Sequence, residues 1–272
     1  MQNDMGNVEN VIKNRELRVI WHWRSFGYFD FVRCVMCVDQ LFGDECRVTP
    51  VIHPSNNLAK AVSWSNTDKW QDGNYPCFGP EDRDKLQIYV TELLRGDAEV
   101  IYLCGNTKPD LSNVSQYQWL LTPKLDVEKQ ASEKANQTIT GDYYVIHGRW
   151  QHQGLDRPMP TDSVIALYEA KIKQVEEEYS NLPIVLICDT MRMREIFQHS
   201  FRNMRQPPTV PSFSNDAMTE KNIVDFFTDI KLIGGAKEIT SVCNFHHGST
   251  GFAKITSAVF DKPYRNVNPG GR

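Results

Sequence analysis

The sequence lacks any long hydrophobic run. No apolar stretch among its 272 residues approaches the roughly 18–20 residues that a bilayer-spanning helix needs. The opening segment, MQNDMGNVENVIKN, also lacks the basic stretch followed by an apolar stretch that marks a secretory signal. We therefore expect no membrane span and a cytoplasmic location.

An excess of positive charge is missing as well. The chain has 30 Lys and Arg against 34 Asp and Glu, for a net charge of −4, which argues against a nucleic-acid-coating protein. The seven cysteines are odd in number, and several lie in apolar runs, which indicates reduced thiols in a cytosol. Cys34 and Cys37 form a CxxC pair, but a zinc site needs a second pair at similar spacing, and the sequence has none. We predict that both are core residues of a helix.

Several catalytic motifs are absent too. No GxGxxG follows the first predicted strand, which argues against a dehydrogenase. Neither GxSxG nor GxxxxGK[ST] occurs, so a hydrolase and a P-loop protein both lack their motifs here.

Asp82-Arg83-Asp84 matches the Asp-x-Asp of metal-dependent sugar transferases in letters, but it lies at a predicted helix start, where acidic residues are common. His246 and His247 are adjacent and have no evident third ligand, so we expect no metal site.

What the sequence does contain is an alternation of short apolar runs with amphipathic stretches, typical of α/β proteins. A polar stretch over about 122–140 divides the pattern, so we predict two lobes, 1–125 and 140–272, facing a cleft. The predicted strands of the first lobe are 17–21, 47–52 and 99–104, and its predicted helices are 29–42 and 80–95.

The second lobe has the clearer pattern. Apolar residues at 164, 168, 172, 175 and 179 predict a helix over 162–179. The continuous run IVLIC at 184–188 is typical of a parallel strand covered on both faces. We also predict strands at 143–146 and 239–243 and helices at 191–199, 219–233 and 252–259, with Gly234-Gly235 ending the second of these helices.

Three predicted strands of this lobe are followed by residues suited to a phosphate. The first runs into His147-Gly148-Arg149, the second into Asp189, and the last into Ser249-Thr250-Gly251 before a helix. Ligands of open parallel sheets bind at the carboxyl ends of the strands. Backbone N–H groups at a helix start can hold a phosphate, and an arginine can add a bidentate contact. Together they predict a pyrophosphate site that needs no metal.

This second half resembles the fucosyltransferases that include the nodulation, core and protein O-fucosyltransferases. YYVIHGRW resembles their strand and His-x-Arg motif. A helix and then PIVLICDT, a strand ending in Asp, follow in the family's order. The acidic helix IVDFFTDIKLIGGAK and the strand, Ser-containing loop and helix of SVCNFHHGSTGFAKITSAVF complete the match. The segment WHWRSFGYFDFVRCVMCVDQLFG is similar to the family's opening strand, loop and helix.

The resemblance implies a GT-B glycosyltransferase with two Rossmann-like lobes, an inverting mechanism, a GDP-sugar donor and no obligatory metal or other cofactor. In the donor site that it implies, Arg149 binds the donor phosphates. The site also contains the other residues of the motifs, which are His147, Asp189, Asp225, Ser249, Thr250, Gly251 and Phe252. The acceptor would be a glycan or another hydroxyl compound.

Two questions stay open at this stage. An acceptor hydroxyl must lose a proton, and both Asp30 and Glu16 are candidate bases, although Asp30 could equally cap a helix. A non-catalytic nucleotide-binding or glycan-binding protein of the same fold is the alternative to a transferase.

Overall fold

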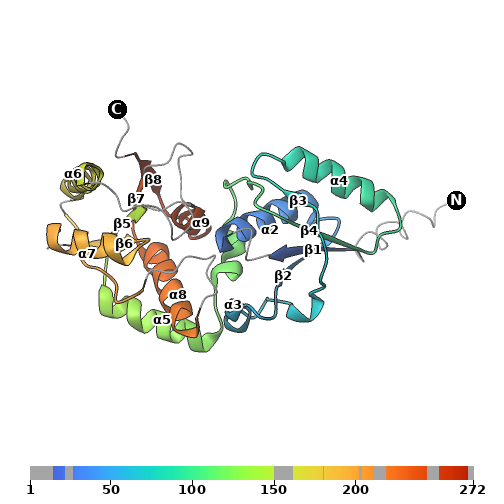
Figure 1. Cartoon of the computed structure of the whole chain (residues 1–272), viewed down its shortest axis with the longest axis horizontal. Helices are drawn as coiled ribbons and strands as arrows, with labels where there is room; N and C mark the ends of the chain where they lie inside the picture. Colours follow the sequence, from blue (N-terminus) through green and yellow to red (C-terminus); the bar gives the residue numbers. More distant parts are fainter. Residues whose placement is uncertain are drawn as a thin grey trace. The chain divides into compact units, whose positions relative to one another are not determined.

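The computed structural model describes residues 15–21, 27–149, 162–179, 181–201, 204–210, 219–243 and 251–268. Its described residues up to Leu120 form one compact unit, and those from Leu121 onward form a second (Figure 1). Each unit has its own four-stranded parallel sheet, so no single sheet runs through both halves of the described chain. No helix in these ranges is both long and apolar enough to span a membrane.

The sheet of the first unit has the order β2-β1-β4-β3, and every pair is parallel. Its strands are β1 Glu16–Trp21, β2 Arg47–Ile52, β3 Cys77–Phe78 and β4 Val100–Gly105. The helical segments are α2 Tyr28–Phe42, α3 Asn57–Ala61, η1 Thr67–Lys69, α4 Arg83–Arg95 and η2 Ser115–Leu121.

Helix α2 supplies much of the core of this unit. Most of its apolar side chains are buried, including both cysteines of the CxxC pair, which confirms that Cys34 and Cys37 are core residues. Asp30 lies in the first turn, and its Oδ2 accepts a hydrogen bond from the Gly27 N–H at 3.1 Å. This contact satisfies one of the N–H groups that a helix start leaves without an intrahelical partner.

The sheet of the second unit has the order β6-β5-β7-β8 and is also parallel throughout. Its strands are β5 Tyr144–Arg149, β6 Ile184–Cys188, β7 Ile239–Cys243 and β8 Tyr264–Val267. The helices are α5 Leu125–Thr138, α6 Asp162–Glu178, α7 Met191–Ser200, α8 Glu220–Gly235 and α9 Gly251–Val259.

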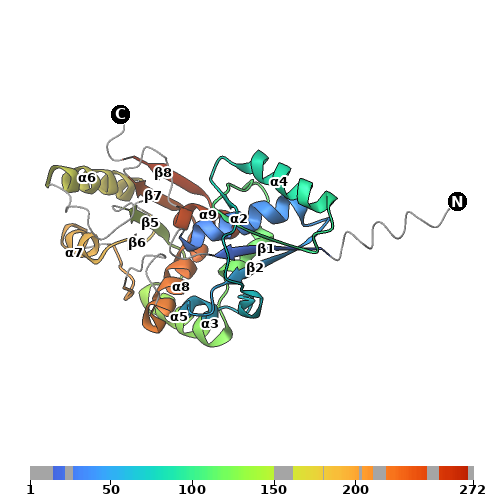
Figure 2. The ribbon, with the colours of Figure 1, turned by 45° about the vertical axis from the view of Figure 1, so that its right-hand side comes forward.

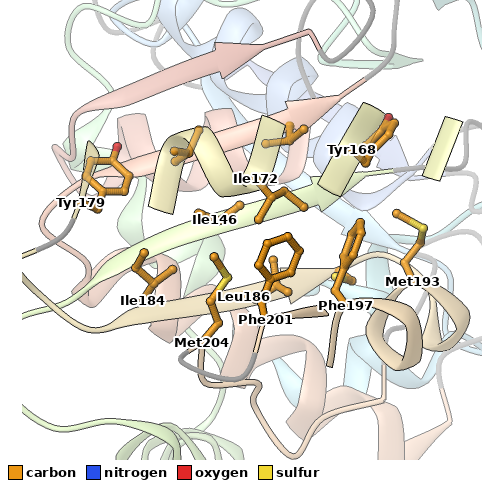
Figure 3. Close-up of a cluster of buried hydrophobic side chains, with 13 residues drawn as sticks. Ile146, Tyr168, Ile172, Tyr179, Ile184, Leu186, Met193, Phe197, Phe201 and Met204 are labelled. Carbon is orange, nitrogen blue, oxygen red and sulfur yellow. The ribbon is translucent and has the colours of Figure 1, made fainter. Parts of the chain in front are cut away.

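Apolar side chains cover both faces of this sheet. On one face, Tyr168 and Ile172 of α6 and Phe197 of α7 pack against Ile146 and Leu186 (Figure 3). On the other face, α8 and α9 pack against the alternate residues of the same strands, among them Val145, Val185 and Ile187. Burial on both faces explains why IVLIC and ITSVC are nearly continuous apolar or small-residue runs.

Helix α5 corrects the sequence-based prediction of a connection over 122–140. The helix lies beside α8 (Figures 1 and 2) and is joined to it by two ion pairs, Lys134–Asp225 and Lys231–Glu128. Its own sequence has few apolar residues, with only Ala131 and Thr138 buried. The sequence of this segment therefore shows no helical pattern of apolar residues, although contacts with α8 hold it as a helix.

Other boundaries differ less. Strands β6 and β7 are confirmed at the predicted residues, whereas β5 continues past Ile146 to Arg149 because it pairs with a strand on each side. Helix α4 begins at Arg83 instead of Pro80, and Gly234-Gly235 form the last turn of α8 instead of following it. Strand β8, which no sequence signal predicted, forms one edge of the sheet.

A charged cluster near the start of β1 leads to a pH-dependent prediction. Burial by itself raises the pKa of Glu16, but hydrogen bonds from Lys69, Thr49 and Arg18 outweigh it and lower the pKa to about 2. A depressed carboxyl pKa contributes stability that is present above the unfolded value of 4.5 and lost as pH falls toward 2. Glu16→Gln should therefore lower the free energy of unfolding by about 1–3 kcal/mol at pH 7.

Urea unfolding of both proteins between pH 7 and pH 2.5 measures this difference. The difference in unfolding free energy should shrink below pH 4.5, because there the Glu16 carboxyl of the unfolded wild type takes up a proton before that of the folded protein does. A destabilisation that stays constant down to pH 2.5 would instead show that the charge of Glu16 contributes nothing.

Candidate functional site

The order of the second sheet fixes where a ligand can bind. The chain leaves β5 for β6 on one side and later returns to β7 on the other side. The two connections therefore diverge between β5 and β7, and ligands of open parallel sheets bind at the carboxyl ends of the strands beside such a divergence. The register pairs Arg149 with Cys243 and Gly148 with Cys188, so β5, β6 and β7 end at the same level.

Arg149 is the last residue of β5, and its backbone is held from both sides. The Tyr168 hydroxyl donates to the Arg149 carbonyl at 2.9 Å, and the Asp189 N–H donates to the Gly148 carbonyl at 3.2 Å. The side chain is half-buried. Because side chains alternate along a strand, Arg149 lies on the same face of the sheet as His147.

His147 is an interior residue, only 3% exposed. Its Nδ1 lies 3.3 Å from the Ser241 hydroxyl, and its ring centroid lies 5.5 Å from that of Phe252 on α9. Burial, together with the positive charge of Arg149, lowers the pKa of His147 to about 3. The imidazole is therefore neutral near pH 7, and it links β5 to β7 and α9 through its contacts.

The contact between His147 and Phe252 places the start of α9 on the face that carries Arg149. Gly251 is the first residue of this helix, and Phe252 is half-buried between His147 and Phe226, whose ring lies 6.0 Å away. Ser249 and Thr250, predicted to bind phosphate, lie outside the described residues. Of the predicted phosphate-binding groups, the structure thus brings Arg149 and the α9 N-terminus to one face of the sheet.

Asp225 is also buried, at 2% exposure, but its two oxygens already have partners in the chain. One forms an ion pair with Lys134 of α5, and the other accepts from the Val210 N–H at 2.9 Å. These contacts join α8 to α5 and to the segment before residue 211. They give Asp225 a structural role, and its predicted contact with the nucleoside stays a prediction.

Asp229, one turn further along α8, was missed by the sequence analysis. Its Oδ1 accepts from the Thr209 hydroxyl at 2.9 Å, and Arg194 donates to the same hydroxyl at 2.9 Å. Burial raises the pKa of Asp229 to about 6, although the nearby guanidinium of Arg194 lowers it in part. Perturbed carboxyls of this kind concentrate at functional sites. The spacing of four residues from Asp225, which puts both carboxylates on one helix face, was the available signal.

The two candidate bases lie in the first unit, and both are held by neighbouring groups. Besides capping α2, Asp30 forms an ion pair with Arg33. Glu16 is the first residue of β1, at the amino end of the strand, opposite the edge where ligands of such sheets bind. Its carboxylate is enclosed by the Lys69, Thr49 and Arg18 contacts, so the suggestion that it acts as a base is not supported.

No group of three or more His, Cys, Asp or Glu side chains in the described ranges could hold a metal ion. Asp82 precedes the first turn of α4, and its Oδ2 accepts from the Gly79 N–H at 2.8 Å. That contact supports the reading of Asp82-Arg83-Asp84 as helix-start charge. His246 and His247 lie outside the described residues.

Two parallel α/β sheets with this topology define a GT-B fold, the class of two Rossmann-like domains found in many sugar transferases. No protein-family model and no curated protein sequence matches the chain. Solved structures do match it, and they confirm the resemblance to fucosyltransferases at the level of the fold.

The NodZ α-1,6-fucosyltransferase soaked with GDP-fucose matches with a TM-score of 0.56 and 13% identity, over 91% of this chain and 93% of that one. The Bradyrhizobium NodZ fucosyltransferase matches with a TM-score of 0.55 and 13% identity, over 90% of this chain and 91% of that one. POFUT1 in complex with GDP-fucose matches with a TM-score of 0.49 and 10% identity, over 95% of this chain and 99% of that one.

The burial of His147 predicts that it does not titrate in the physiological range. Its lowered pKa favours the neutral imidazole in the folded protein, so folding stability should fall as pH drops below the ordinary value of 6.5. Side-chain ¹⁵N NMR should show one histidine that stays neutral at pH 5, and this signal should be absent from His147→Asn. A His147 signal that titrates near pH 6.5 would show that the ring is solvated.

Proposed function

We propose that this chain is a glycosyltransferase that moves a sugar from a GDP-sugar to a glycan or other hydroxyl acceptor, in the manner of a fucosyltransferase. The second unit binds the donor, and the first unit binds the acceptor. The seven cysteines, all within the described residues, form no disulfide, which supports a reducing compartment such as the cytoplasm.

The observation that carries this proposal is the position of Arg149. It ends the central strand β5 at the point where the connections to β6 and β7 diverge, on the sheet face that also carries the α9 N-terminus. A guanidinium and the N–H groups at a helix start each favour the binding of a diphosphate, and they do so independently. The NodZ enzymes that share this fold were soaked with GDP-fucose or co-crystallised with GDP, which supports a guanosine diphosphate donor.

The chemistry follows from where charge develops. As the glycosidic bond breaks, negative charge grows on the departing diphosphate, and a cation positioned beside it stabilises the transition state. The acceptor oxygen attacks the anomeric carbon on the face opposite the leaving group, which inverts its configuration. Arg149 and the N–H groups near Ser249, Thr250 and Gly251 stabilise the leaving diphosphate, and His147 positions the strand that carries Arg149.

The other donor contacts follow the same edge of the sheet. Asp189, which follows β6, and Asp225 contact the nucleoside or the sugar, and Phe252 lies beside the phosphate-binding helix start. Asp30 was proposed as the base, but its contacts with Gly27 and Arg33 support a structural role. The proton of the acceptor hydroxyl therefore goes to another residue of the first unit or to the donor itself.

Arg149→Ala should reduce sugar transfer by about 30-fold to 1,000-fold, equivalent to about 2–4 kcal/mol of transition-state stabilisation. It should also abolish most of the thermal stabilisation by GDP, since a bound ligand raises the melting temperature by mass action. UDP, ADP and TDP provide the nucleotide comparison. Lys173→Ala, which removes an exposed positive charge from α6, is the matched control and should behave like the wild type.

Each result has a distinct meaning. Unchanged turnover in Arg149→Ala would exclude the assigned role. Binding of GDP without hydrolysis or transfer of any GDP-sugar would favour the alternative of a non-catalytic nucleotide-binding protein of this fold.

Transfer should also survive EDTA at saturating donor, because protein groups instead of a divalent ion neutralise the donor diphosphate. The measurement compares initial rates with and without chelator on the purified protein. Complete loss of transfer that added manganese or magnesium restores would reassign Asp189 and Asp225 as metal ligands.

A further inference from the structure

A row of aromatic side chains runs from the core of the first unit to its surface, beginning at the carboxyl end of β1. Trp21, the last residue of β1, is buried and packs on Tyr28 and Phe31 of α2, with ring centroids 5.6 and 5.9 Å away. Trp64 stacks on the same two rings at 6.4 and 6.2 Å. Trp119 meets Trp64 edge to face, at 5.9 Å and 85°. We call Trp64 and Trp119 the aromatic shelf.

The shelf exposes a large apolar ring on an anchored piece of backbone. Trp119 is 42% exposed, whereas the next two residues, Leu120 and Leu121, are buried. The Tyr28 hydroxyl donates to the Leu120 carbonyl, which ties the η2 turn to α2. The indole ring is thus held at the surface by its neighbours, at the edge of the sheet where ligands of parallel α/β sheets bind.

A polar group at the shelf also lacks a partner. The Trp64 Nε1 atom is buried and has no hydrogen-bond acceptor in the described part of the chain. A buried donor left without an acceptor costs about 1–3 kcal/mol. Because this atom is enclosed, the part of the shelf that a ligand can reach is the exposed indole of Trp119.

The segments that carry the shelf are uncharged. Residues 111–121, LSNVSQYQWLL, and residues 61–66, AVSWSN, contain no Asp, Glu, Lys or Arg. Asn113 and Gln116, both exposed, place side-chain amides on the same segment as Trp119. A phosphate or a sulfated sugar would call for cations here. An exposed indole instead suits the C–H face of a neutral sugar, whose polarised hydrogens are attracted by the negative face of the ring.

We propose that Trp64 and Trp119 form a stacking site for a sugar ring of a neutral glycan. The inference rests on the proposed function only in identifying that glycan as the acceptor. Sugar binding at the shelf itself follows from the first unit alone and requires no donor.

Binding can be measured on an array of neutral oligosaccharides of hexoses and N-acetylhexosamines, printed beside their sulfated and sialylated counterparts. The wild type should bind neutral glycans in preference to the anionic ones. Trp119→Ala should weaken that binding about tenfold or more, since the ring contact contributes roughly 1–2 kcal/mol. Trp119→Phe, which keeps an aromatic face, should restore most of the affinity.

Trp70→Ala is the matched control. Trp70 is a half-buried indole whose Nε1 donates to Asp72 at 3.1 Å, and it packs near Ile20 and Val51 instead of at the shelf. A second readout needs no variant: a bound neutral glycan should protect Trp119 from oxidation by N-bromosuccinimide, followed by mass spectrometry.

The proposal is overturned if no neutral glycan binds, if anionic glycans are preferred, or if Trp119→Ala binds as the wild type does. Thermal shift with GDP, run in parallel, separates this result from the donor site. Neutral-glycan binding without GDP binding would retain the shelf and reject the transferase. GDP binding with no role for Trp119 would retain the transferase and reject the shelf.

Discussion

The parallel pairing of β5 between β6 and β7 is the constraint on which the rest of the candidate site depends. Because the three strands run in the same direction and are nearly in register, their carboxyl ends lie at one edge. The sheet order then separates the connections that follow β5 and β6, and ligands of open parallel sheets bind beside such a separation. If β5 did not pair with a strand on each side, Arg149 would lie beyond the end of the strand. Strand alternation would then not determine which face of the sheet its side chain lies on.

Side chains on both faces of the sheet hold that pairing. His147 is buried against Ser241 and Phe252, and Tyr168 reaches the Arg149 carbonyl from the opposite face. A protonated imidazole at this depth would repel the neighbouring guanidinium, and burial prevents this by keeping the ring neutral. The His-x-Arg pattern can therefore be understood as one interior residue and one residue at the sheet edge, placed on the same face by strand alternation.

The elements that the sequence predicted well are those whose own residues determine them. Strands β6 and β7 are buried on both faces, so their apolar runs mark their ends, and α6 shows its apolar stripe at Tyr168, Ile172, Val175 and Tyr179. Helix α5 was missed because long-range ion pairs with α8, invisible to local periodicity, help to hold it. For the same reason Asp225 was predicted only as a ligand-binding residue. Its partners, Lys134 and the Val210 N–H, are 91 and 15 residues away, and Asp229 was not considered.

Arg149 and the aromatic shelf offer different chemistry to a ligand, one cationic and the other apolar. In the second unit the side chain of Arg149 is half-buried, and partial removal from water strengthens the attraction between its guanidinium and an anion. In the first unit Trp64 and Trp119 lie on segments without charged side chains, where an ion would find no compensation for its lost hydration. Arg149 therefore favours an anion such as a diphosphate, whereas the exposed indole of the shelf favours a neutral ligand with an apolar face. These are the two kinds of recognition that the proposed transfer, from a charged donor to a neutral acceptor, requires.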